Sequence, residues 1–286
     1  MRIGFIGAGK VGFSLGRYFV EHGIEVTGYY SQNIESSEAA ADFTHTKTYY
    51  TIERILSDSD TLFITVPDGR IRDIWDDMAN LDIKNKIICH CSGSISSATF
   101  FDAEKRNAKV YSVHPLYAIS DKYNSWKSLK QAVFTVEGTK DGLEDIKGLL
   151  TDCGNKVIIM DGDKKALYHG AAVTASNLAA GLFHLSSKML ERCGFDRETA
   201  EKALAGLFLG NAQAIAEKGP VEALTGPVER NDRLTVEKHF EAFDGEENFD
   251  EVKEIYRRLS MELVELAELK HPDREYGELL EVLKSK

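Results

Sequence analysis

The chain has 286 residues, of which 43% are hydrophobic and 28% charged, and only 5 are prolines. This composition is typical of a globular protein and argues against disorder, and the length suffices for two domains. The formal net charge of −11 argues against nucleic acid or an anionic membrane as a partner, because either needs a basic surface.

Strand-like runs alternate with helical stretches from residue 1 to about residue 160. The runs are rich in Val, Ile, Phe and Tyr and end in turn residues. In order they read RIGFIG, EVTGYY, TLFITV, KIICHC, KVYSVHP, AVFTVEG and KVIIMDG. This alternation predicts an α/β domain with a mostly parallel sheet and helices on both of its faces.

The sequence after Gly162 becomes helical, and strand-like runs are almost absent. Helical periodicity recurs in residues 165–193, 196–218, 233–243 and 248–269. Glycine and proline break the pattern between these stretches. The second half is therefore predicted to be all-helical.

A glycine-rich turn follows the first strand, where Gly7, Gly9 and Gly12 have GxGxxG spacing. In a dinucleotide site the first glycine permits a tight turn, the second lets the backbone approach the pyrophosphate, and the third allows close packing of helix and strand. The pyrophosphate lies at the helix N-terminus, so Lys10 and Val11 join the three glycines as predicted cofactor-binding residues. The alternative is a bare tight turn.

The predicted fold is therefore α/β, with two domains. An N-terminal Rossmann dinucleotide-binding domain covers residues 1–162, and an all-helical domain for substrate binding and dimerisation covers residues 163–286.

The apolar start of the sequence carries Lys10 and Arg17 without a small-residue cleavage pattern, so no signal peptide is expected. Because no run reaches about 18 uninterrupted apolar residues, we expect no membrane span and a cytoplasmic protein.

The end of the second strand lacks the acidic residue with which NAD sites usually bind the ribose 2′-hydroxyl. The sequence there reads EVTGYYSQN, so Ser31, Gln32 and Asn33 take its place. Their side chains can donate hydrogen bonds to a 2′-phosphate, which an aspartate would repel. The arginine expected of an NADP site is missing as well. We predict NADP as the cofactor, with NAD left as the alternative.

Two further loops follow predicted strand ends. TVPDGRI contains Val66 and Pro67, and HCSGSIS contains Ser92 and Gly93. Ligands of open α/β sheets bind beyond the carboxyl ends of the strands, so these loops are predicted to border the nicotinamide and its ribose. The alternative is ordinary turn chemistry at each proline and glycine.

Cys89, His90 and Cys91 look like a fragment of a metal site. The surrounding NKIICHCSG has a strand pattern, however, and alternation along a strand sends both sulfurs to one face and the imidazole to the other. We therefore predict buried thiols and no metal site. Four cysteines in 286 residues are too few for a disulfide scaffold and are typical of free thiols in a reducing compartment.

His114 and Pro115 follow the next strand, in VYSVHPLYAISD, where they are predicted to open a loop. A histidine on the carboxyl edge of the sheet can meet the substrate, so His114 is a candidate catalytic residue. The alternative is structural: His114 hydrogen-bonds a loop while Pro115 ends the strand.

Residues 165–185 read KALYHGAAVTASNLAAGLFHL, which predicts one long helix of small and apolar residues with polar side chains set into it. A helix advances about 100° per residue, so Ser176 would lie about 20° from His169. Lys165 would lie about 40° from His169, and Asn177 about 80° away. A shared polar face is typical of a site. A core helix with a satisfied histidine and an exposed lysine gives the same pattern.

A dense polar cluster lies between two predicted helices in EALTGPVERNDRLTVEKHF, residues 222–240. Arg230 is predicted to clamp a substrate carboxylate or phosphate, which an acidic protein has to bind locally. Alternatively, Asp232 caps the helix that follows, and Gly226 and Pro227 simply turn the chain.

Together, these motifs resemble a known family. A GxGxxG domain followed by an all-helical half resembles the 6-phosphogluconate dehydrogenase-like superfamily, which includes pyrroline-5-carboxylate reductases, ketopantoate reductases and prephenate dehydrogenases. VPD, CSG, SVHPL, YHGAAVTASN and LTGPVERND resemble more closely the Rossmann-like proteins with a DUF2520 C-terminal domain, described as NADP oxidoreductases. The resemblance covers nearly the whole chain and implies no particular substrate.

In the wider superfamily, a lysine or histidine and an asparagine from the first helix of the second domain face the nicotinamide. The resemblance therefore implies His169 and Asn177 as catalytic residues, with Lys165 and Ser176 nearby. The sequence departs from the superfamily pattern because it has no clear Lys-x-x-x-Asn at this place. Relatives also bury helices rich in small residues, such as HGAAVTASNLAAGLF, against a second subunit, and we predict a two-fold homodimer.

We predict an NADP-dependent oxidoreductase that transfers a hydride between the nicotinamide and a small anionic carbonyl or imine compound. The alternative is a dinucleotide-binding sensor or regulator without turnover. The candidate catalytic residues are His169, Asn177, His114, Ser176 and Arg230.

Overall fold

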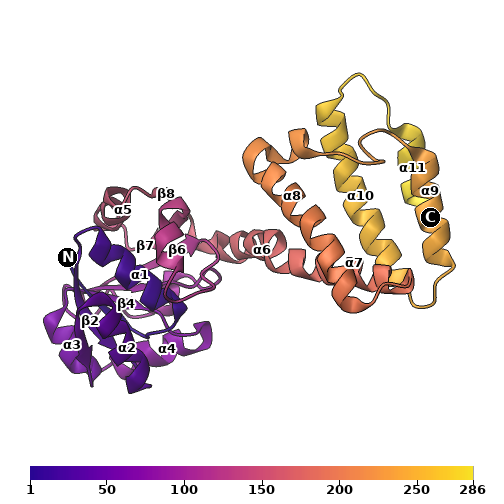
Figure 1. Ribbon diagram of the computed structural model, residues 1–286. Helices are drawn as coiled ribbons and strands as arrows, with labels where there is room; N and C mark the ends of the chain where they lie inside the picture. Colours follow the sequence, from indigo (N-terminus) through magenta and orange to yellow (C-terminus); the bar gives the residue numbers. More distant parts are fainter. Residues whose placement is uncertain (286) are drawn as a thin grey trace. The chain divides into compact units, whose positions relative to one another are not determined.

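The computed structural model describes residues 1–285, which divide into two compact units. The first runs from Met1 to Ala175, and the second begins at Ser176. Figure 1 shows the first unit as a sheet with surrounding helices, and the described part of the second as helices. The predicted fold class, an N-terminal Rossmann-like α/β domain followed by an all-helical region, is confirmed.

The sheet of the first unit has the strand order β3-β2-β1-β4-β5-β6-β7-β8 among the described residues. Every neighbouring pair is parallel except β6 and β7. The strands are β1 (Arg2–Ile6), β2 (Glu25–Tyr30), β3 (Lys47–Tyr49), β4 (Thr61–Ile64), β5 (Ile87–His90), β6 (Lys109–Leu116), β7 (Val133–Gly138) and β8 (Lys156–Ile159).

Helices pack on both faces of this sheet, over two separate cores. Strand β4 contributes to both cores, because successive side chains of a strand point to opposite faces of the sheet. Phe63 belongs to one core, while Leu62 and Ile64 belong to the other, as expected for a strand buried on both sides. The helices of this unit are α1 (Lys10–Glu21), α2 (Ile34–Thr44), α3 (Ile52–Asp58), α4 (Asp68–Asp77), α5 (Leu143–Asp152), α6 (Lys165–Ala175) and the 3₁₀ turns η1 (Ser97–Thr99), η2 (Ser125–Gln131) and η3 (Gly162–Lys164).

The strand order reverses at β1, because the chain continues from β1 to β2 on one side and returns to β4 on the other. A reversal of this kind opens a crevice at the carboxyl ends of the strands, where ligands of doubly wound sheets bind. The loops that follow β1, β2, β4 and β5 all lie on this edge.

Strand β6 continues through Pro115 to Leu116, so the prediction that these residues open a loop is wrong. Beyond Ser112, β6 has no pairing with β5 and is paired only with antiparallel β7. Proline is tolerated here because only one neighbouring strand takes hydrogen bonds from this part of β6. His114 is therefore held in a strand, opposite Thr135.

The second unit packs its helices around one core that includes Phe240, Val264 and Leu283. Its helices are α7 (Asn177–Arg192), α8 (Arg197–Ala223), α9 (Arg233–Asp244), α10 (Asp250–Lys270) and α11 (Gly277–Ser285). Non-helical backbone at Gly219, before Pro220, interrupts α8. None of the helices within residues 1–285 is long and apolar enough to cross a membrane.

The single long helix predicted over residues 165–185 is wrong, because the structure has α6 and α7 separated at Ser176. Ser176 has φ −117° and ψ −67°, which departs from helical geometry. Angles measured around one continuous helix axis therefore do not apply across this residue. Helix α6 begins at Lys165, close to the predicted domain boundary at 162/163. It belongs to the first compact unit, however, so the division into units falls later, between Ala175 and Ser176.

Candidate active site

The glycine turn after β1 is tightly built. Gly7 has φ +107°, and a Cβ atom added there would meet the Thr65 backbone at 2.8 Å. A Cβ atom at Gly12 would lie 2.5 Å from both the Gly7 carbonyl oxygen and Thr65 Oγ1. The Thr65 hydroxyl in turn donates to the Gly7 carbonyl at 2.7 Å. Side chains at either glycine would force the first strand, the first helix and the loop after β4 apart.

Gly9 differs from these two glycines because it borders open space. It is exposed at the N-cap of α1, and a Cβ atom there would have Thr65 O, at 3.9 Å, as its nearest neighbour. The first turn of α1 carries no acidic side chain. A helix N-terminus with this access attracts an anion, since its backbone N–H groups and its dipole both favour negative charge.

A pocket of about 390 Å³ adjoins this turn and is lined by residues that follow β1, β2 and β4. Ser31, Gln32 and Asn33 line it, and Asn33 caps α2 by accepting a hydrogen bond from the Ser36 N–H at 3.1 Å. Val66 and Pro67 give it an apolar side, and Arg70 also lines it. These residues bring a glycine turn at a helix N-terminus, hydrogen-bonding side chains and an apolar surface into one crevice.

A serine cluster orders the loop after β5. Ser92 Oγ and Ser94 Oγ both donate to Asp68 Oδ2, at 2.8 and 2.9 Å, and the Ile95 N–H donates to Ser92 Oγ at 3.0 Å. Asp68 begins α4, so these bonds tie the loop after β5 to the loop after β4. Sequence reasoning placed both loops on this edge but did not single out Asp68 as their link.

Two histidines meet the backbone at Gly93. A Cβ atom there would lie 2.8 Å from His169 Cδ2 and 2.9 Å from His114 Nε2. The structure thus brings together three of the predicted site residues, Gly93, His114 and His169, and Ser92 precedes them in the loop. The absence of a side chain at Gly93 is what allows both imidazoles to approach.

His114 is hydrogen-bonded to Tyr168, with 2.7 Å between Nδ1 and the phenol oxygen and the rings at 87°. Burial, the nearby Lys165 charge and His169 lower the pKa of His114 to about 4. Its imidazole is therefore neutral near pH 7. Tyr168 itself was not among the predicted site residues, although it stands one residue before His169.

Lys165 is buried, and its ammonium donates to the Ser92 carbonyl at 2.8 Å and to Ser112 Oγ at 2.7 Å. Burial lowers its pKa from the ordinary value. The alternative in which this lysine is exposed is therefore wrong. Sequence reasoning gave Lys165 only a neighbouring role. The signal that could have found it is the Lys-x-x-x-His spacing to His169, which puts both on one helix face.

The other candidate catalytic residues lie in the second unit. Ser176 Oγ donates to Asn177 Oδ1 at 3.0 Å where α7 begins. Arg230 is exposed in the loop before α9. Asp232 caps α9 by accepting from the Thr235 N–H at 3.1 Å, which confirms the capping alternative. A substrate role for Ser176, Asn177 and Arg230 stays a prediction.

The Cys-His-Cys segment follows strand alternation as predicted. Cys89 and Cys91 pack with one core of the sheet, while the His90 ring stacks obliquely at 5.4 Å on Phe100 in the other. Burial raises the pKa of Cys91 to about 12, so its thiol is protonated. Among residues 1–285, no three potential metal-ligating side chains gather as a candidate site.

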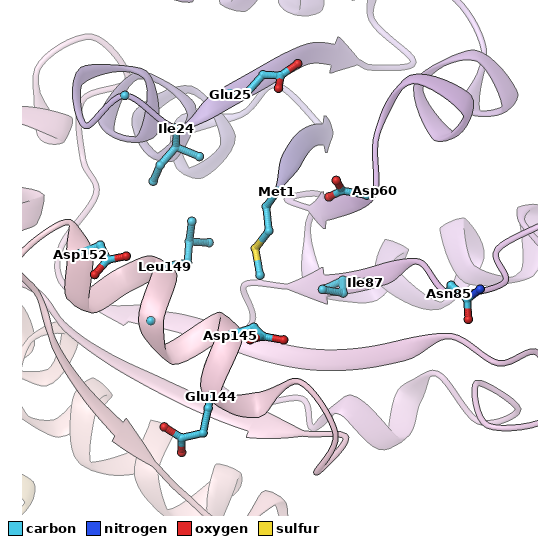
Figure 2. Close-up of a pocket in the computed structure, with 12 residues that line it drawn as sticks. Met1, Ile24, Glu25, Asp60, Asn85, Ile87, Glu144, Asp145, Leu149 and Asp152 are labelled. Atoms are coloured by element: carbon cyan, nitrogen blue, oxygen red, sulfur yellow. The ribbon is translucent and has the colours of Figure 1, made fainter.

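A larger hollow, of about 850 Å³, lies at the opposite edge of the sheet, where the strands begin (Figure 2). Carboxylates surround it, from Glu25 and Asp60 at the strand starts and from Glu144, Asp145 and Asp152 on α5. Because these carboxylates would repel a diphosphate, this hollow does not suit a dinucleotide.

Two family models match the chain. Residues 2–92 match the family described as NADP oxidoreductase coenzyme F420-dependent, and residues 132–263 match DUF2520, a domain of unknown function. The resemblance drawn from the motifs is therefore confirmed: a match to a family of NADP oxidoreductases at the N-terminal residues precedes a match to DUF2520. None of the curated proteins compared with the chain matches it significantly.

Solved structures share this fold. Protein TM1727 of Thermotoga maritima is 27% identical, with a TM-score of 0.75 over 94% of this chain and 99% of its own. BF3122 of Bacteroides fragilis, described as a candidate NADP oxidoreductase, is 20% identical, with a TM-score of 0.66 over 92% and 98%. The pyrroline carboxylate reductase of Plasmodium falciparum, solved with NADP bound, is 11% identical, with a TM-score of 0.54 over 79% and 85%.

Proposed function

We propose that the protein is an NADP-dependent oxidoreductase that transfers a hydride between the nicotinamide and a small carbonyl or imine compound with an anionic group. The observation that carries the proposal is the pair of imidazoles at Gly93, on the same sheet edge as the glycine-lined pocket. A dinucleotide extended along this edge from β1 brings its nicotinamide toward the loops after β4 and β5. The family of residues 2–92 and the NADP in the Plasmodium reductase support this reading.

The residues present fit a dinucleotide. The open space at Gly9 and the N-terminus of α1 suit the diphosphate, and Ser31, Gln32 and Asn33 suit an adenosine ribose with a 2′-phosphate. NADP is favoured over NAD because no carboxylate is among the described residues that line this pocket. When bound, the cofactor supplies the hydride chemistry, and the protein supplies orientation and a proton.

His114 is the proposed proton donor. In the proposed tautomer, the Tyr168 hydroxyl donates to Nδ1 and the ring proton is on Nε2, the nitrogen that faces Gly93. From there Nε2–H can protonate the oxygen or nitrogen of the substrate, while Tyr168 passes its own proton to Nδ1. Burial raises the pKa of Tyr168, so this relay depends on the positive charge of Lys165, 5.6 Å from the Tyr168 ring centroid, to offset the cost of the phenolate.

The remaining candidates have supporting roles in the proposal. His169, the second imidazole at Gly93, contacts the substrate beside His114. Ser176, Asn177 and Arg230 belong to the second unit, and their contacts with substrate stay a prediction from the sequence. For Arg230 the predicted partner is the anionic group, since a guanidinium pairs with a carboxylate in a bidentate manner.

Cofactor binding and turnover test the proposal in two stages. NADPH and NADH are first titrated by calorimetry, and keto acids and cyclic imines are then screened for oxidation of NADPH. His114→Gln should reduce kcat about a hundredfold or more while leaving the Kd for NADPH unchanged, as expected when a general acid is removed. The matched control is His22→Gln, because His22 hydrogen-bonds the Tyr18 carbonyl at the far end of α1.

The outcomes separate the two predicted functions. Tight NADPH binding without turnover of any keto acid or imine would favour the sensor, which needs only affinity for the dinucleotide. Failure to bind either dinucleotide would refute both functions.

A further inference from the structure

The dinucleotide pocket contains an arginine that sequence reasoning did not connect with the cofactor. Arg70 stands in the first turn of α4, three residues after Pro67, and lines the pocket together with Ile74. Residues four apart lie on the same face of a helix, so this face of α4 borders the pocket. The same pocket is lined by Ser31 and Asn33 from the loop after β2.

Arg70 carries the one formal charge near pH 7 among the described residues that line this pocket. Ser31, Gln32, Asn33 and Ser36 supply hydroxyl and amide groups, while Val66 and Pro67 are apolar. A phosphate dianion that binds to a chain with a net charge of −11 needs a cation close by. Hydroxyls and amides orient such a phosphate but do not neutralise it.

The guanidinium is available for this role. Its Nε bonds Asp73 Oδ2 at 2.9 Å, and both side chains are about half exposed, at 52% and 53%. An exposed ion pair between residues three apart is weak because water screens it. A phosphate offers Arg70 a stronger, bidentate partner, and the remaining N–H groups of the fork can make that contact while Nε stays with Asp73.

The second arginine of α4 provides a contrast. Arg72 Nε bonds Asp76 at 3.1 Å, and its guanidinium lies 4.0 Å from the centroid of the Phe101 ring. Arg72 is not among the described residues that line the pocket. The two arginines lie on the same helix, carry the same charge and are exposed to the same degree. They differ in the face of the helix on which they lie.

We propose that Arg70 binds the 2′-phosphate of NADP(H) and sets the preference of this protein for NADP over NAD. The inference rests on the proposed function, because it requires that the pocket hold a dinucleotide. The helix after β4 then supplies the cation that the loop after β2 lacks, and the serine and amide side chains of that loop complete the phosphate site.

Binding titrations test this inference without any turnover assay. The Kd is measured for two matched pairs of ligands, NADPH with NADH and 2′,5′-ADP with 5′-AMP, and only the first of each pair carries the 2′-phosphate. Arg70→Ala should weaken NADPH and 2′,5′-ADP about tenfold or more, and NADH and 5′-AMP less than about twofold. Arg70→Lys, which keeps the charge but loses the fork, should show an intermediate loss.

The controls make each result decisive. Arg72→Ala should leave all four Kd values within about twofold, since it removes the same charge from the other face of the helix. Circular dichroism of each variant checks that the fold is retained. Equal weakening of both members of a pair would assign Arg70 to the adenine or the diphosphate and overturn the inference, as would an unchanged preference in Arg70→Ala. A wild-type protein that binds neither dinucleotide would instead refute the proposed function itself, and this inference with it.

Discussion

A buried ammonium needs hydrogen-bond acceptors, and Lys165 has two, the Ser92 carbonyl and Ser112 Oγ. Its charge also acts on its neighbours, because it is the largest influence after burial that lowers the pKa of His114. At the scale of single residues, the site is thus a neutral imidazole held beside a buried cation. In this arrangement the His114 imidazole is better suited to act as a neutral hydrogen-bond donor than as a permanently charged imidazolium acid.

Removal of that cation should change the titration of His114. Lys165→Met keeps the length and removes the charge, so the His114 pKa should rise from about 4 toward its ordinary value. Titration of isotope-labelled histidine followed by NMR measures it. Lys164→Met is the matched control, because Lys164 is the exposed neighbour in η3 and should leave this pKa unchanged. A His114 pKa that is the same in both variants would contradict the assigned cause.

The histidines also predict how stability depends on pH. Burial is the main cause that lowers the pKa of both His90 and His114 to about 4, from 6.5 in the unfolded chain. Between these values the unfolded chain binds protons that the folded chain does not, so the free energy of unfolding falls as the pH falls from about 6.5 to about 4. Urea unfolding near pH 7 and near pH 5 measures the loss, and His114→Gln should reduce it. An equal drop in wild type and variant would exclude His114 as a contributor.

Gly9 offers a test of the phosphate-binding turn. Its added Cβ atom would enter open space, so Gly9→Val should leave the fold intact and reduce dinucleotide affinity about tenfold or more, by blocking the approach of the diphosphate. Calorimetry measures the Kd. Gly148→Val on α5, where an added Cβ atom would have no neighbour within 4 Å, is the control and should bind normally. Unchanged affinity in a folded Gly9→Val protein would remove the diphosphate from this turn.

At the scale of elements, the ends of helices and strands carry most of the polar chemistry. Asp68 at the start of α4 ties down the loop after β5, and Asn33 caps α2 beside the pocket. In the second unit, Asp232 caps α9 and accepts from both the N–H and the hydroxyl of Thr235. Each cap uses a side chain to satisfy a backbone donor that the helix itself leaves unpaired.

The cap of α9 should be measurable by mutation. Asp232→Ala removes both bonds to Thr235 and should cost about 1 kcal/mol of unfolding free energy. Arg230→Ala, two residues earlier on an exposed side chain, should cost less than about 0.5 kcal/mol. Denaturant unfolding of both variants compares them. If Arg230→Ala proved the more destabilising, Arg230 would have a structural role in place of the proposed contact with substrate.

At the scale of the whole molecule, the helices rich in small residues remain largely exposed. Each of α6, α7 and α8 has one buried residue among those described, namely Lys165, Ser187 and Ala200. Large apolar side chains on α8 are exposed, with Leu207 at 64% and Leu209 at 67%. Such surfaces are uncommon on monomers, so they support the predicted homodimer.

Light scattering at micromolar concentration tests this association. A dimer has twice the sequence mass of 31.9 kDa, and a mass near 31.9 kDa would refute the prediction. Leu207→Glu should shift the protein toward the monomer, because a charge cannot be buried unpaired in an interface. Leu269→Glu on α10, where the leucine is 70% exposed, is the matched control and should leave the mass unchanged.

Local sequence determined most of the elements. The glycine spacing, the apolar runs of seven strands and the helical periodicity after Gly162 each depend on neighbouring residues, and all of them correspond to elements of the structure. Strand β3 and helix α11 are among the elements that were not predicted. Strand β3 has only three residues and pairs only with β2. Helix α11 is short, and its apolar face packs into the core of the second unit. Strand β3 and helix α11 are both too short for hydrophobic periodicity to reveal them in the sequence.

The tertiary structure decided which side chains meet. Lys165 is buried because the loop after β5 and the strand β6 supply its two acceptors, and these residues are distant from it in sequence. Arg70 lines the pocket because α4 follows the strand beside β1, a placement that strand order alone determines. The break at Ser176 ended a helix that periodicity had predicted to continue. Periodicity describes how one segment faces its surroundings, whereas burial, pKa and the partners of a charge depend on groups that only the folded chain brings within reach.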